Sequence, residues 1–177
     1  VIAIGKFASA NAQDSIVLGR NAGSTSPYGI AIGRNAQSLT NSYTIAIGSG
    51  NTNTDSANAT GANSLAVGRG TDSTTTGSLS IGWNAQATGG VYSIAIGGGS
   101  TTALSARASA ANAISLGRGT LSNSVGSIAI GWNAQATTSI YAVAIGSGPA
   151  PASAANATGI RSVAIGFGTD ATNSNSV

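Results

Sequence analysis

The sequence has no cysteine, methionine, histidine or glutamate, and only 6% of its 177 residues are charged. The absence of cysteine excludes a disulfide framework and a thiolate metal site. Without cysteine or histidine, neither a Ser-His-Asp nor a Cys-His catalytic centre can be built. The four carboxylates, Asp14, Asp55, Asp72 and Asp170, are far apart, and no pair is spaced for acid–base catalysis. We therefore expect a protein that is not an enzyme and that uses no metal or other cofactor.

Long apolar runs and clusters of charge are also lacking. No apolar stretch approaches the roughly 20 residues of a membrane-spanning helix, and no signal peptide is visible. The seven Lys and Arg residues are spread thinly along the sequence, a distribution that argues against nucleic-acid binding. Hydrophobic residues make up 41% of the chain and the net charge is only +3, which argues against disorder. We expect regular burial of small and β-branched residues, with no membrane contact within this chain.

What the sequence does contain is a repeat. A four-residue element, in which an aliphatic residue, a small residue and a second aliphatic residue precede a glycine, occurs eleven times. Its glycines are Gly5, Gly19, Gly33, Gly48, Gly68, Gly82, Gly97, Gly117, Gly131, Gly146 and Gly166. They follow one another at intervals of 14, 14, 15, 20, 14, 15, 20, 14, 15 and 20 residues. We expect each glycine to turn the chain, since glycine tolerates a positive φ.

The order 14, 15, 20 defines a super-repeat of 49 residues. Its copies are residues 19–67, 68–116 and 117–165, with partial repeats at 1–18 and 166–177. We interpret residues 1–177 as one repeat domain and expect it to be a fragment of a longer protein. The 20-residue intervals keep the repeated element and lengthen only a turn, which predicts extended outer loops within residues 49–64, 98–113 and 147–162.

Alternation of large and small residues is typical of a strand with two distinct faces. We expect the large residues, such as Ile30 and Ile32, to point into each coil. A weaker alternation after the glycine, as in Ala85 and Ala87, predicts a second strand with small residues inward and amides outward. Two strands and two turns fill 14 residues, so the sequence predicts one coil of a parallel β-solenoid per repeat.

Homo-oligomerisation is expected because two aliphatic residues per coil are few to stabilise a free-standing chain. We expect small residues of the repeat to point outward, where other chains approach closely. These small residues include Ala31, Ala46, Ala95 and Ala129.

The repeats resemble a known family. Ser93–Gly97, Ser127–Gly131 and Ser162–Gly166 read Ser-Ile/Val-Ala-Ile-Gly, and with the 14-residue spacing they resemble the head repeats of trimeric autotransporter adhesins, with YadA-like heads. The similarity covers essentially the whole chain. It implies an all-β, left-handed parallel β-roll of about eleven coils and a side-by-side homotrimer. It also implies an extracellular location, held on a bacterial outer membrane by segments outside this chain.

The same resemblance implies an adhesive function, in which the rod binds host extracellular matrix, cells, glycans or surfaces. The chain departs from the family in its 49-residue cycle of extra residues, where the family runs in near-uniform steps of 14. The neck, stalk and membrane anchor of the family are not found in these residues. Similar repeats occur in phage tail fibres, so a virion tail-fibre or extracellular filament segment with the same fold is the alternative.

Two columns of residues are candidate ligand contacts. The first lies directly after a turn glycine in successive super-repeats, and the second consists of tyrosines. The members of the two columns are Arg34, Trp83 and Trp132, and Tyr43, Tyr92 and Tyr141. Equivalent residues are three coils apart, or about 14 Å at roughly 4.8 Å per coil. Aromatic faces at this spacing are suited to stacking on sugars or gripping apolar groups of a partner. The alternative is that they cover the seam between subunits or fill a wide turn.

A further set of arginines, Arg20, Arg69 and Arg118, also recurs every 49 residues directly after a glycine. These side chains are suited to attracting an anionic ligand. The alternative is that they are solvated or bridge to a neighbouring chain.

Overall fold

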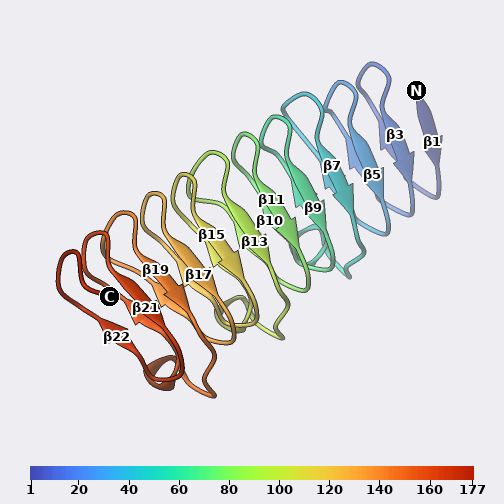
Figure 1. Cartoon of the computed structure of the whole chain (residues 1–177). Coiled ribbons are helices and arrows are strands. Elements are labelled where there is room, and N and C mark those ends of the chain that lie inside the picture. The colour runs from blue at the N-terminus through green and yellow to red at the C-terminus, as the bar shows by residue number, and fades with distance from the viewer.

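The computed structural model describes residues 1–177 as a stack of coils built from two 11-stranded parallel sheets (Figure 1). The first sheet holds the three-residue strands β1 (Ile2–Ile4), β3 (Ile16–Leu18), β5 (Ile30–Ile32), β7 (Ile45–Ile47), β9 (Leu65–Val67), β11 (Leu79–Ile81), β13 (Ile94–Ile96), β15 (Ile114–Leu116), β17 (Ile128–Ile130), β19 (Val143–Ile145) and β21 (Val163–Ile165). The second sheet holds the two-residue strands β2 (Ser9–Ala10), β4 (Gly23–Ser24), β6 (Gln37–Ser38), β8 (Asn58–Ala59), β10 (Asp72–Ser73), β12 (Gln86–Ala87), β14 (Arg107–Ala108), β16 (Leu121–Ser122), β18 (Gln135–Ala136), β20 (Asn156–Ala157) and β22 (Asp170–Ala171). The predicted fold class, an all-β parallel solenoid, is confirmed.

Each strand pairs with the equivalent strand of the next coil, so equivalent residues form columns along the rod. Ala31 pairs with Ala46, for example, and Gln86 with Arg107. The pairing keeps this register through the longer coils because the additional residues lie in the turns. We call the turn after each repeat glycine the first turn and the turn before each first-sheet strand the second turn.

The 20-residue coils carry their additional residues in the first turn. The second-sheet strand begins four residues after Gly19 but ten residues after Gly48. The longer loops were predicted to be extended, and this is only partly right, because each contains one 3-10 turn. These turns are η1 (Asn53–Asp55), η2 (Thr102–Leu104) and η3 (Pro151–Ser153). In η1 the Asp55 carboxylate accepts a hydrogen bond of 2.7 Å from the backbone N–H of Thr52, which favours the turn over an extended segment.

The interior of the coil is narrower than the sequence predicted, and the predicted orientation of the first sheet is wrong. The small middle residues of its strands point inward and are fully buried, among them Ala31, Ala46, Ala95 and Ala129, each 0% exposed. The large residues on either side point outward. The second sheet is as predicted, with Ala85 and Ala87 buried and Gln86 on the outer face.

The physical reason is the closeness of the two sheets in a 14-residue coil. Both sheets contribute alanine or serine to the interior, and the largest fully buried side chains are only those of Val17, Thr44, Thr71 and Thr120. An isoleucine at the position of Ala31 would meet the opposite sheet. The volume between the sheets, and not the hydrophobicity of the residues, decides which face of each strand is buried.

Serine replaces alanine at several interior positions without leaving its hydroxyl unpaired. Ser80 donates a hydrogen bond of 2.7 Å to the backbone carbonyl of Asp72, and Ser115 donates one of 2.6 Å to that of Arg107. The hydroxyls of Ser122 and Ser127 lie 2.7 Å apart. A serine that donates to the backbone of its own coil stays buried at low cost, because its polar atom is satisfied.

The large residues of the first sheet form an outward-facing surface that we call the aliphatic face. It consists of the first and third residues of the eleven strands, in two parallel columns. At about 4.8 Å per coil these columns run roughly 48 Å along the rod. Its side chains are half-buried or exposed; Ile47 is 38% exposed, and Ile96 and Ile145 are each 37% exposed. The argument that small outward residues seat a partner chain therefore fails, and the aliphatic face takes their place.

Candidate ligand-binding edge

The repeat glycines stack directly on one another and so align the residues that follow them. Gly33 has φ +120°, and a Cβ atom on it would lie 2.3 Å from the carbonyl oxygen of Gly48. Only glycine permits this backbone at this distance. The residues after the glycines form one column, which we call the first-turn column. Its members are Lys6, Arg20, Arg34, Ser49, Arg69, Trp83, Gly98, Arg118, Trp132, Ser147 and Phe167.

Asparagines fix three members of this column against the next coil. Asn35, Asn84 and Asn133 have left-handed φ values of +58° to +60°. Their side-chain amides donate to the backbone carbonyls of Gly50, Gly99 and Gly148, at 2.9, 3.0 and 3.0 Å. Asparagine tolerates this conformation better than most residues and here supplies a hydrogen bond as well. Arg34, Trp83 and Trp132 each precede one of these asparagines, so each stands where a long first-turn loop begins.

The structure unites two sets of residues that the sequence treated separately. The Arg69 guanidinium lies over the Trp83 ring, 5.8 Å from its centroid, and Arg118 lies over Trp132 at 5.7 Å. These are cation–π pairs between adjacent coils. Trp83 is 44% exposed and Trp132 41%, so each ring keeps surface open to solvent.

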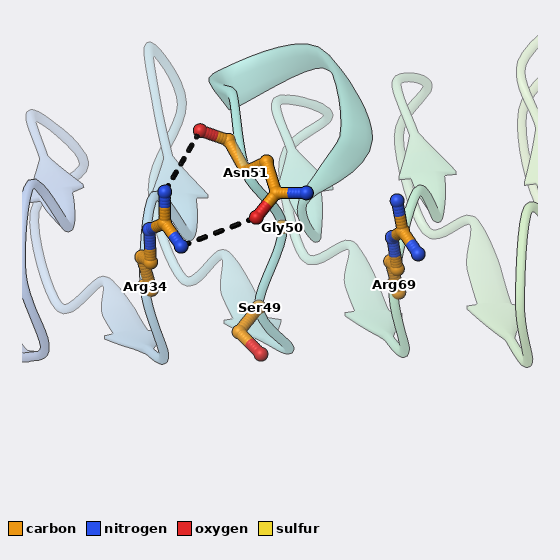
Figure 2. A pocket seen from close by; sticks show the side chains of 5 residues that line it. All are labelled: Arg34, Ser49, Gly50, Asn51 and Arg69. Carbon is orange, nitrogen blue, oxygen red and sulfur yellow. Dashed lines mark hydrogen bonds between the residues drawn. The ribbon is translucent and has the colours of Figure 1, made fainter.

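An open hollow of about 180 Å³ lies beside Arg34, between coils of the first super-repeat. Figure 2 shows Arg34 and Arg69 rising on the same side of the chain, one on each side of Ser49–Asn51. Arg34 donates to the side-chain oxygen of Asn51 at 3.1 Å and to its carbonyl at 3.4 Å. All of the lining side chains that carry polar groups are exposed.

A single carboxylate stands beside this hollow. Asp55 of η1 forms an ion pair of 2.9 Å with Arg69. Hydrogen bonds from the Thr52 backbone N–H and from Arg69 lower the pKa of Asp55 from 3.8 to about 2. Asp55 is therefore an anion at neutral pH and partly neutralises Arg69, whereas Arg34 has only the neutral Asn51 as a partner.

The predicted tyrosine column lies on the second turn, where Tyr43 precedes β7, so the structure does not bring it together with the first-turn column. The rings of Tyr28 and Tyr43 stack, with centroids 4.9 Å apart and planes 7° from parallel. Sequence reasoning missed Tyr28, although it lies 15 residues before Tyr43, which is one coil.

The other two tyrosines lie over glycines. A Cβ atom on Gly77 would lie 2.5 Å from the Tyr92 ring, and one on Gly126 would lie 2.7 Å from the Tyr141 ring. The outer faces remain open, because Tyr92 is 61% and Tyr141 53% exposed. Each of these rings rests on the preceding coil as a flat, solvent-facing surface.

The repeats also match a family model. The model of the YadA head domain repeat matches residues 2–22, 24–51, 55–71, 76–100, 122–148 and 153–177. The chain belongs to the YadA head repeat family. The YadA-like head is an adhesin module, and this chain has both its repeat and the expected β-solenoid. The family is a family of cell-surface adhesins and not of enzymes. No curated protein matches the chain.

In this YadA-like head no helix is long and apolar enough to span a bilayer. No three His, Cys, Asp or Glu side chains are grouped as metal ligands would be. The features with exposed, orderly chemistry are the two turn columns and the aliphatic face.

Proposed function

We propose that this chain is a rod segment in the head of a trimeric adhesin on a bacterial cell surface. Three copies pack through their aliphatic faces, and the turns carry the contacts to host matrix, cells, glycans or other surfaces. The first-turn and tyrosine columns are the proposed contact residues.

The observation that carries the proposal is the aliphatic face. Apolar patches on monomeric proteins rarely exceed a few hundred Å², and this face runs about 48 Å along the rod. Its residues alternate with the buried alanines on the same strands, so the fold cannot turn them inward. Burying each exposed isoleucine against another chain contributes up to about 1–2 kcal/mol.

Membership in the YadA head family supports three copies of this chain as the occupants of that face. Because every copy presents the same face along its whole length, side-by-side packing about one axis buries all coils alike. The turns at the two edges of the face then border the interface, with their outermost side chains toward solvent.

Solution mass and adhesion test the proposal together. Multi-angle light scattering on the 16.9 kDa chain is expected to give three times that mass, with a β-rich circular dichroism spectrum. Beads coated with the trimer are expected to adhere to matrix-coated surfaces. A folded monomer at micromolar concentration would remove the trimer from the proposal, and trimers that adhere to no surface would remove the adhesive function.

A further inference from the structure

The first super-repeat departs from the other two at one position of the first-turn column. In the second and third copies an arginine is followed, one coil later, by a tryptophan, as in Arg69–Trp83 and Arg118–Trp132. In the first copy Arg20 is followed by Arg34, so a second cation stands where the others have a ring. Lys6 precedes both by one coil. We call Lys6, Arg20 and Arg34 the cationic segment.

The backbones of the cationic segment are consecutive rungs of one ladder. The N–H of Asn21 donates to the Lys6 carbonyl, and that of Asn35 donates to the Arg20 carbonyl, each at 3.0 Å. Three cations are therefore fixed about 5 Å apart at their Cα atoms. All three side chains are exposed, and like charges on neighbouring rungs repel one another.

No carboxylate relieves this repulsion. Of the seven Lys and Arg residues, five lie in the first-turn column, whereas the single ion pair of the structure is Asp55–Arg69. Asp72 and Asp170 begin strands of the second sheet, and Asp14 lies in a second turn. The structure thus gathers charge that the sequence spreads thinly, and it leaves the cationic segment uncompensated.

We propose that the cationic segment and the adjoining hollow at Arg34 bind a sulfated polysaccharide. Guanidinium groups bind oxyanions through paired N–H donors. A row of such groups on consecutive coils fits a polymer with closely spaced anions better than it fits one small anion. Further along the same column, Trp83 and Trp132 offer partly exposed faces to sugar rings.

Single-stranded nucleic acid is the less suited polyanion. Its binding sites combine cations with aromatic rings on which successive bases stack. The cationic segment has only Phe7 beside it, already 5.1 Å from the Lys6 ammonium. The inference rests on the proposed adhesive function and gives it a ligand class.

The chain supplies its own test variant. Arg34→Trp places in the first copy the residue that the other two copies carry, so we expect it to fold. Surface plasmon resonance over immobilised heparin at low salt is expected to show binding roughly five-fold weaker than that of the parent. The reciprocal Trp132→Arg, beside Arg118, creates a second pair of adjacent arginines and is expected to strengthen binding by a similar factor.

Arg161→Gln is the matched control, because it removes one charge from a second turn, away from the column, and is expected to bind nearly as the parent does. Equal losses for Arg34→Trp and Arg161→Gln would overturn the site, as would single-stranded DNA that competes as well as heparin. A changed solution mass for Arg34→Trp would overturn it by placing the column in the subunit seam. Hyaluronan, which has carboxylates but no sulfates, is expected to compete weakly, and equal competition would overturn the requirement for sulfate. Adhesion to matrix without heparin binding would defeat this inference alone, whereas failure of both would also defeat the proposed function.

Discussion

At the scale of single residues, alanine and serine set the width of each coil. The interior accepts side chains of one to three heavy atoms, and a serine there donates to its own coil's backbone. Isoleucine, the larger and more hydrophobic residue, is excluded to the outside. Exposure in this protein follows from volume first and from hydrophobicity second.

Ala95→Leu tests this order. Because Ala95 is 0% exposed between two closely spaced sheets, leucine at this position is expected to destabilise the fold by at least about 2 kcal/mol. Urea unfolding followed by circular dichroism measures the change. Ile94→Leu, at the adjacent outward position, is the control and is expected to cost less than about 1 kcal/mol. An Ala95→Leu chain as stable as the parent would return the small residues to the outer face, as the sequence predicted.

Asp72 gives the stability a dependence on pH. Burial raises the pKa of Asp72 above 3.8, against hydrogen bonds from Asn58 and Gln86, which lower it. The folded chain therefore holds this proton more tightly than the unfolded chain. Its contribution to stability is full below about pH 3.8, falls as pH rises through the raised pKa, and is constant above it.

Asp72→Asn removes this titration. The melting temperature of the variant is expected to equal or exceed that of the parent at pH 7, and its decline between pH 4 and pH 6 is expected to disappear. Asp55 acts in the opposite direction and in another window, since its pKa of about 2 makes its stabilisation fade as pH drops from 3.8 toward 2. Thermal melts across pH 2 to 8 separate the two, and an unchanged decline above pH 4 in Asp72→Asn would rule out this assignment.

At the scale of elements, each first-sheet strand has two functions in three residues. Its middle residue fills the coil, and its outer two residues build the aliphatic face. The first turn that follows carries charge and aromatic rings, and the second turn carries the tyrosines. Strand and turn chemistry are therefore kept apart, which lets loops lengthen without disturbing the pairing.

Ile96→Glu tests the role of the aliphatic face. Ile96 is an exposed member of this face, so a carboxylate there leaves the coil intact but places three like charges together in a trimer. Light scattering is expected to show the mass falling from three chains to one, with an unchanged circular dichroism spectrum. Ile160→Glu is the control, because Ile160 is 44% exposed on a second turn. A trimer that persists in Ile96→Glu would show that the face lies outside the interface.

The sequence predicts the strands and their pairing but not their orientation. Glycine spacing fixes where each coil closes, so Ala31 and Ala46 were placed in register correctly. An alternation of period two shows that Ile30 and Ala31 face opposite ways, yet it does not say which way is inward. That depends on the distance between the two sheets, which no local pattern encodes. The union of Arg69 with Trp83 was missed similarly, since it requires seeing that the two 49-residue sets are neighbours in one column.

At the scale of the whole molecule, the chain is a rod whose sides differ. One side is aliphatic, the opposite side carries the amides and carboxylates of the second sheet, and the edges carry the turn columns. Because each coil contacts mainly its neighbours, the stability of the rod is close to a sum over coils and their interfaces.

The strands lie across the rod, and the hydrogen bonds between coils run along it (Figure 1). A pull on the two ends of a single chain therefore opens the ladder one coil at a time, as a zipper opens, and does not shear all the strands together. Each coil releases its own length of chain, about 5 nm for 14 residues and about 7 nm for 20 at roughly 3.5 Å per residue. Optical-trap extension of the chain is expected to show steps of these sizes at low, nearly constant force, and one large rupture would contradict it. Such a rod would yield gradually under load and recover coil by coil when the load is removed.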